Sequence, residues 1–121
     1  MSVAGGDLQD QTSLQLLLQV IEFGRMPKVA IPAPRFRTYH IQDSFNPSPT
    51  AEGRLLKIGA ADINPTEETV LDNLKNRGHD VNIIKGNIAS PVMIYIDQAT
   101  GMCHAASLPN VKYCAALNTS K

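Results

Sequence analysis

The stretch from Gly5 to Pro27 constrains the fold more than any other part of the sequence. It begins with a glycine pair, and from Leu14 to Phe23 it is apolar at almost every position, with polar residues only three or four positions apart. This spacing predicts one helix with a narrow polar stripe, which must be buried on most of its circumference. Gly24 and Pro27 predict the end of the helix. The polar stripe consists of Gln11, Gln15, Gln19 and Glu22.

The glycine pair in front of this helix is the first candidate functional feature. Gly5 and Gly6 let the backbone approach another group closely, and a helix N-terminus offers free amides and a partial positive charge. That combination suits an anion, or the oxyanion of an acyl-transfer intermediate. A flexible loop that leads into the helix is the simpler interpretation of the dipeptide taken alone.

The order of several short segments along the chain is a more specific signal than the glycine pair alone. After the glycine pair come an acidic-aromatic-glycine helix end, an Ala-Pro-Arg-Phe segment, a second helix end followed by a strand, and a closing hairpin. In this order and spacing the chain resembles the gamma-glutamyltransferase family over nearly its whole length. The segments are Gly5-Gly6-Asp7, Glu22-Phe23-Gly24, Ala33-Pro34-Arg35-Phe36, Arg77-Gly78-His79-Asp80-Val81 and Ala99–Ser107.

The resemblance implies a mixed fold of helices and strands, α/β (α+β), that forms part of the αββα sandwich of N-terminal-nucleophile hydrolases. Residues 1–121 would be a single domain, the C-terminal portion of a gamma-glutamyltransferase-like small subunit. The parent reaction would transfer a gamma-glutamyl group, from a glutathione-type donor, to water or an amine. Two alternatives stay open: a related acylase or amidohydrolase on the same scaffold, and a non-catalytic binding or structural module.

The same resemblance assigns few catalytic groups to this chain. The family's N-terminal threonine nucleophile lies upstream of the matched segment, and neither Thr12 nor Thr38 replaces it. Only Gly5 and Gly6 carry over, as oxyanion-hole amides, while the substrate-binding residues stay unknown. No metal or cofactor is implied. The implied partners are a small gamma-glutamyl substrate and the upstream part of the same enzyme, namely the large subunit and the N-terminal half of the small subunit, so the chain alone is expected to be inactive.

Other side chains give weaker signals. Arg35 could hold a substrate carboxylate or form a structural ion pair. Cys103 and His104 are neighbours on a predicted strand, where adjacent side chains point to opposite faces, which disfavours a catalytic pair. The three histidines are too scattered for a metal motif. Cys103 and Cys114 could be buried separately or joined in a disulfide.

Composition excludes some classes of partner. Eleven basic residues balance eleven acidic ones, which argues against a nucleic-acid partner. No apolar run approaches a membrane span. Residues 1–10 do not resemble a signal peptide, so the compartment is unknown, although a bacterial family member would be periplasmic or extracellular. Unpaired sheet edges and apolar faces predict self-association of the isolated chain.

The remaining elements follow from periodicity and turn residues. A helix is expected to begin at the cap residue Asn64, to bury Val70, Leu71 and Leu74, and to end at Gly78. Pro91–Asp97 reads as a central strand covered on both faces, with Met102–Ser107 as its hairpin partner. The other expectations are one helical turn within Lys28–Pro34, a loop over Gln42–Gly53, and strands at Arg35–Ile41, Leu55–Ile58, Asp80–Lys85 and Val111–Leu117.

Overall fold

A computed structural model describes residues 1–40, 42–54 and 57–109. The chain forms two compact units. The first contains Met1–Gly5, Gln9–Ala33 and the described residues from Ala89 onward, and the second contains Gly6–Leu8 and Pro34–Ile88. Each is considered separately below. That the whole chain acts as a single domain stays a prediction.

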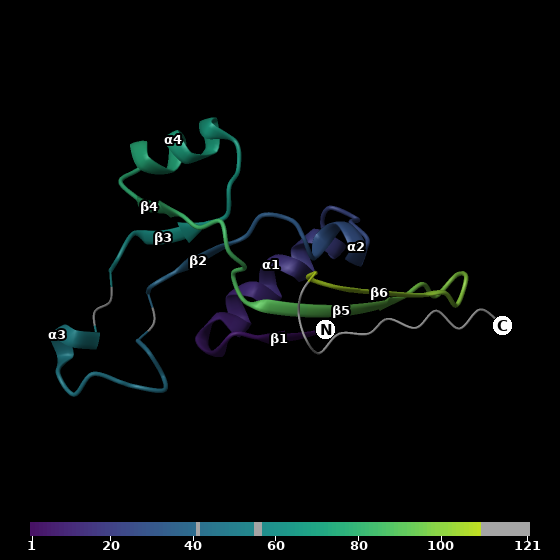
Figure 1. The fold of residues 1–121 in the computed structure, drawn as a ribbon, viewed down its shortest axis with the longest axis horizontal. Coiled ribbons are helices and arrows are strands. Elements are labelled where there is room, and N and C mark those ends of the chain that lie inside the picture. Colours follow the sequence, from purple (N-terminus) through teal and green to yellow (C-terminus); the bar gives the residue numbers. More distant parts are fainter. Residues whose placement is uncertain (41, 55–56, 110–121) are drawn as a thin grey trace. The chain divides into compact units, whose positions relative to one another are not determined.

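The first unit is an antiparallel sheet with helices on one face (Figure 1). Its core consists of apolar side chains from both helices, the central strand and the residue after the last strand, and this packing holds the layers together. The sheet has the order β1-β5-β6 and comprises β1 (Ser2–Ala4), β5 (Ser90–Ile96) and β6 (Cys103–Ser107). The helices are α1 (Gln9–Ile21) and α2 (Pro27–Ala30). The core residues are Leu16, Ala30, Ile31, Met93 and Leu108.

Helix α1 has the predicted position, but its expected burial is wrong for the residues that the structure describes. Only Thr12 and Leu16 of this helix are buried. Ile21 is 71% exposed, and Phe23, just past the helix, is 66% exposed. The reason is that the sheet and α2 pack against one side of α1, whereas the apolar sequence runs around most of it. Leu14, Leu17 and Leu18 are also exposed, so the outer side of α1 is an uncovered apolar face.

Strand β5 is central, as predicted, and pairs with β1 and β6. The expectation that it is covered on both faces is wrong. Met93 is buried in the core, whereas Ile94, the next residue, is 63% exposed. Adjacent strand residues point to opposite faces of a sheet. The helices therefore cover one face of β5, and within the described part of the chain Ile94 stays exposed on the other. The hairpin to β6 is confirmed, and its turn is held by hydrogen bonds from Ala99 N and Thr100 Oγ1 to the Asp97 carboxylate, at 2.9 and 2.8 Å.

The second unit contains a three-stranded sheet in the order β2-β3-β4. Strand β2 runs antiparallel to β3, whereas β3 and β4 are parallel and are joined by helix α4, which Figure 1 shows above them. The elements are η1 (Gly6–Leu8), β2 (Phe36–Thr38), α3 (Ala51–Arg54), β3 (Ala60–Ile63), α4 (Glu68–Asn76) and β4 (Asp80–Ile83).

Two expectations for this unit fail on local grounds. The strand predicted at Leu55–Ile58 begins instead at Ala60, because Gly59 with φ +83° turns the chain just before it. Leu55 and Leu56 lie outside the described residues. Helix α4 ends just before Gly78, as predicted, where the chain turns with φ +88°. The helix buries Leu71, but Val70, which was also expected to be buried, is exposed. The predicted strand Val111–Leu117 and Cys114 also lie outside the described part of the chain.

Asn64 is not the cap of α4. The N-cap is Glu67, which makes no side-chain cap hydrogen bond. The Asn64 side chain instead accepts a hydrogen bond from Arg35 N at 3.1 Å and donates to Ile84 O at 3.0 Å and Gly86 O at 2.9 Å. It therefore connects the ends of all three strands of the second sheet.

This corrected role predicts a larger effect of Asn64→Ala than the loss of a cap. Three hydrogen bonds disappear, each contributing about 0.5–1.5 kcal/mol net, so we expect unfolding to become easier by about 2–3 kcal/mol in urea denaturation. Asn73→Ala is the matched control, because its side chain donates to Thr69 O one helical turn earlier, at 2.8 Å, a contact within a single helix. Equal midpoints for the two variants would contradict the connecting role.

Candidate functional site

Gly6 is the member of the glycine pair whose surroundings are clearest. It has φ +56°, and a Cβ atom added to it would lie 3.0 Å from Phe45 Cε2. The positive φ favours glycine here, because L-residues rarely adopt it. An added Cβ would also require the Phe45 ring to shift. Gly6 opens η1, which leads directly into α1.

The loop that carries Phe45 is held beside Gly6 by the Asp7 carboxylate, whereas the Asp43 carboxylate closes a turn within the loop. Ser44 N donates to Asp7 Oδ2 at 2.8 Å, and this bond lowers the pKa of Asp7. Phe45 N and Asn46 N both donate to Asp43 Oδ1, at 2.9 and 3.2 Å. Sequence reasoning identified the glycines and predicted the loop but missed the contact between them, because it joins residues nearly forty positions apart.

Gly5 is exposed and precedes the turn. Its function as an oxyanion donor, like that of Gly6, stays a prediction. Thr12, fully buried in α1, has a hydroxyl without a hydrogen-bond partner in the described structure. The Thr12 hydroxyl is therefore shielded from solvent in the described structure, and the absence of a nucleophile from this chain stays a prediction.

A second polar cluster lies on one face of the β2-β3-β4 sheet and is centred on Asp62, which is 4% exposed. Arg37 and Asn82 stand directly opposite Asp62 on the two neighbouring strands. Arg37 Nε and Nη2 each lie 2.6 Å from Asp62 Oδ2, Asn82 Nδ2 donates to Oδ1 at 2.9 Å, and the Tyr39 hydroxyl also donates to Oδ2. The carboxylate thus uses most of its acceptor capacity on protein donors.

The pKa values in this cluster move in opposite directions. Burial raises the pKa of Asp62. The hydrogen bonds from Tyr39, Asn82 and Arg37, together with the Arg37 charge, lower it by more, so the net shift is downward. The hydrogen bond to Asp62 and burial raise the pKa of Tyr39. The cluster is therefore a satisfied ion pair that joins three strands, and a general base would need a freer carboxylate. A polar hollow of about 320 Å³, with Lys57 and Asp80 also in its lining, lies beside it.

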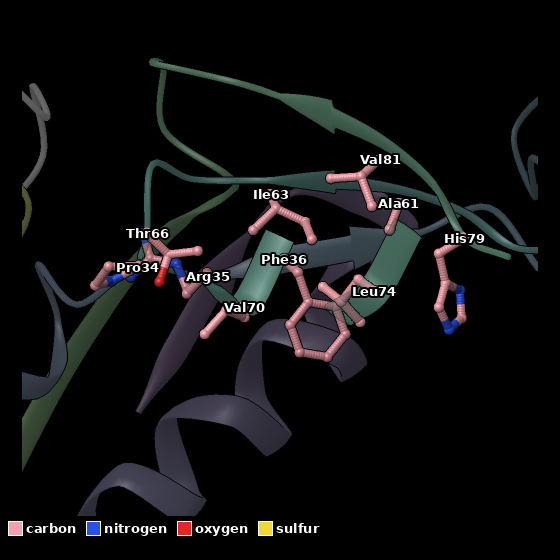
Figure 2. A pocket seen from close by; sticks show the side chains of 10 residues that line it. All are labelled: Pro34, Arg35, Phe36, Ala61, Ile63, Thr66, Val70, Leu74, His79 and Val81. Carbon is pink, nitrogen blue, oxygen red and sulfur yellow. The ribbon is translucent and has the colours of Figure 1, made fainter. Parts of the chain in front are cut away.

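The opposite face of this sheet is apolar and forms a groove of about 340 Å³ beneath α4. Figure 2 shows the groove with His79 at one end and Pro34, Arg35 and Thr66 at the other. Between these ends the lining consists of Phe36, Ala61, Ile63, Val70, Leu74 and Val81. The sequence missed the groove because each of these residues is, in its own element, an ordinary core-facing position.

Arg35 is buried, and its Nε donates to Ile88 O at 3.3 Å. Burial lowers the pKa of this guanidinium. The position at one end of the groove is compatible with either sequence-based interpretation, a carboxylate ligand or a structural role.

The remaining nucleophiles and histidines are scattered. Cys103 is exposed and His104 is partly buried near the Tyr95 ring, with centroids 6.2 Å apart. His40 and His79 both contact the backbone of Gly59, at 3.3 Å. Among the residues that the structure describes, no group of three or more His, Cys, Asp and Glu side chains is arranged to hold a metal ion. Over the same residues, no helix is both long and apolar enough to cross a membrane.

Comparison with solved structures decides the fold. The gamma-glutamyltranspeptidase from Pseudomonas nitroreducens complexed with L-DON matches 98% of this chain with a TM-score of 0.70 and 17% sequence identity. The chain has the gamma-glutamyltranspeptidase fold. The cephalosporin acylase from Bacillus halodurans matches 89% of the chain with a TM-score of 0.69 and 23% identity, and LmbA2991T421A matches 89% with a TM-score of 0.73 and 25% identity.

The gamma-glutamyltranspeptidase fold extends beyond this chain in the solved structures. The chain spans 54% of the Pseudomonas nitroreducens chain, 18% of the cephalosporin acylase chain and 19% of LmbA2991T421A. No protein-family model and no curated protein matches the sequence. The resemblance read from the sequence and the mixed α+β class are thus confirmed at the level of the fold.

Proposed function

We infer that the chain is one part of a gamma-glutamyltransferase-like enzyme, to which it supplies the amides of Gly5 and Gly6 as oxyanion donors. The observation that carries this proposal is the fold match over 98% of the chain, combined with a glycine pair directly before α1. Preorganised backbone amides stabilise the charge that develops on a carbonyl oxygen during acyl transfer. The nucleophile would be an N-terminal threonine in an upstream part of the enzyme, which uses its own amine as base.

The exposed face of α1 supports the existence of such a partner. Leu14, Leu17, Leu18 and Ile21 are all exposed on a helix whose opposite side is packed. Uncovered apolar patches on this scale mark protein interfaces, and the solved structures carry additional chain beyond the matched part. In this proposal the upstream part covers the face, and the isolated chain self-associates through it.

A second candidate is an acylase that removes a different acyl group. The match to the cephalosporin acylase from Bacillus halodurans supports it, with a TM-score of 0.69 and 23% sequence identity. The two candidates share the scaffold and the oxyanion-hole amides. They differ in the acyl group that the site binds.

One experiment tests both candidates. The chain alone is expected to hydrolyse no gamma-glutamyl para-nitroanilide and to scatter light as oligomers at micromolar concentration. When co-expressed with the sequence encoded upstream of Met1, it should co-purify with that part and gain turnover. Glutaryl para-nitroanilide, which lacks only the α-amino group, is the matched substrate: a preference for it would favour the acylase. Turnover by the isolated chain, or a stable monomer with no affinity for the upstream part, would contradict the proposal.

A further inference from the structure

Phe45 is an exposed aromatic residue beside the candidate oxyanion donor Gly6. Apart from Gly6 and its chain neighbours, the three atoms nearest to the position that a Gly6 Cβ would occupy all belong to the Phe45 ring, with Cε2 at 3.0 Å and Cδ2 and Cζ at 3.8 Å. Phe45 is nevertheless 79% exposed. One edge of the ring therefore lies against Gly6, while most of the ring stays open to solvent.

Hydrogen bonds rather than burial hold the ring in this place. Asp7 follows the candidate donor directly in the chain, and its carboxylate accepts the bond from Ser44 N. The Asp43 carboxylate accepts bonds from Phe45 N and Asn46 N, which fix the backbone on both sides of the ring. The glycine and the loop belong to the same unit of the fold, so the ring is an apolar surface at a defined position beside the candidate amide.

The ring lies close enough to the Gly6 amide to touch a substrate that this amide binds. Bonds of about 1.5 Å join both the amide nitrogen and the Cβ position to the same Cα, so Phe45 Cε2, 3.0 Å from the Cβ position, lies within about 6 Å of Gly6 N. A carbonyl oxygen bound by that amide would lie about 2.7–3.2 Å from the nitrogen. One of the two substituents of the carbonyl carbon, the acyl chain or the leaving amine, can therefore extend across the ring.

The chemistry of the two substituents favours the leaving amine. A gamma-glutamyl group ends in an ammonium and a carboxylate, and a glutaryl group ends in a carboxylate, so either acyl group requires charged or polar partners when it leaves water. The side chain of phenylalanine has neither a polar atom nor a charge. It does pack against a second aromatic ring in an offset or edge-to-face arrangement, and an aromatic amine supplies such a ring.

We propose that Phe45 is a specificity-determining residue that packs against the leaving amine and favours aromatic amides over small aliphatic ones. In the acylation step, the oxygen of the nucleophile bonds to the carbonyl carbon, the amide C–N bond breaks, and the amine departs with the proton that the nucleophile gives up. Asp7 is a positioning residue, because it acts on the ring through Ser44. This inference rests on the proposed acyl-transfer function, since it needs the carbonyl oxygen at the Gly6 amide.

The test uses the enzyme assembled from both parts and two amides that share one acyl group. These are gamma-glutamyl para-nitroanilide and gamma-glutamyl methylamide, or the corresponding glutaryl pair if that acyl group is the one turned over. Phe45→Ala should lower the ratio of kcat/KM for the anilide to kcat/KM for the methylamide about tenfold, the effect of losing one aromatic contact. Ile58→Ala is the matched control, because Ile58 is 81% exposed in the same unit, and it should leave the ratio unchanged.

Variants of Asp7 test the positioning role. Asp7→Ala removes the acceptor of the Ser44 N–H and should lower the same ratio toward that of Phe45→Ala. Asp7→Asn keeps an acceptor oxygen on the side chain and should retain most of the wild-type ratio. A ratio unchanged in Asp7→Ala would reject Asp7 as the residue that positions the ring.

The outcomes separate this inference from the proposed function. If the wild-type assembly turns over the amides but Phe45→Ala leaves the ratio unchanged, the inference is overturned and the proposed function stands. An equal fall of kcat/KM for both amides would mean that the ring supports the Gly6 amide instead of contacting the amine. Loss of co-purification with the upstream part, at an unchanged ratio, would assign the ring to the interface. If the wild-type assembly turns over neither pair of amides, the proposed function is rejected and this inference with it.

Discussion

Gly6→Ala is expected to lower kcat of the assembled enzyme by about 10²–10³-fold, the effect of losing one oxyanion donor. Gly6 has φ +56°, and an added Cβ would lie 3.0 Å from Phe45 Cε2. Alanine is strained at this positive φ, and rotation of the backbone to relieve the strain turns the amide away from its present direction. Turnover of gamma-glutamyl para-nitroanilide by the enzyme assembled from both parts is the measurement, and the expectation depends on the proposed function.

Gly24→Ala is the control for this prediction. Gly24 has almost the same conformation, φ +60°, but an added Cβ would meet nothing within 4 Å. Both variants incur the cost of a non-glycine residue in the left-handed region, about 1 kcal/mol or more, whereas only Gly6→Ala disturbs the neighbouring loop. A similar loss of kcat in both variants would assign the effect to stability, and an unchanged kcat for Gly6→Ala would reject Gly6 as an oxyanion donor.

Asp62→Ala is expected to destabilise the second unit by about 2–4 kcal/mol, because it leaves Arg37, Tyr39 and Asn82 without their common acceptor. The lower end of the range reflects Arg37, whose side chain is 31% exposed and can regain water. Hydrogen exchange of the β3 and β4 amides, together with the urea midpoint, measures the loss. Asp80→Ala, at an exposed carboxylate that lines the same hollow, should change stability by no more than about 0.5 kcal/mol.

The contribution of Asp62 should also depend on pH in one direction. Its folded-state pKa lies below the ordinary value of 3.8, so the unfolded state binds the proton more readily than the folded state. The stabilisation is therefore fully present above about pH 4 and is lost as the pH falls through the lower folded-state pKa. The stability difference between the wild type and Asp62→Asn should shrink over that acidic range. A difference that stays constant down to acid unfolding would contradict the ion-pair assignment.

Signals carried by neighbouring residues predicted local structure well. The apolar run ending at Gly24 gave α1, and the Asp97–Gly101 turn gave the β5-β6 hairpin, because each depends on conformational preferences within a few positions. The ordered segments from the glycine pair to the hairpin were enough to indicate the fold that the structural comparison confirms.

Partners distant in the sequence were beyond such reasoning. Asn64 has the sequence context of a helix cap, but its side chain instead bonds to Arg35, Ile84 and Gly86. These partners come together only when the three strands are aligned. The contact between Gly6 and Phe45 depends in the same way on where the long loop returns.

The sequence by itself thus indicated most of the helices and strands and the position of the candidate oxyanion donors, because backbone preferences and side-chain periodicity are local. Only the tertiary structure decided which apolar positions are covered. Leu16 and Ile21 lie in the same apolar run, yet one is fully buried and the other largely exposed. Burial depends on which elements pack against each side of a helix, and the sequence of the helix alone does not specify those elements.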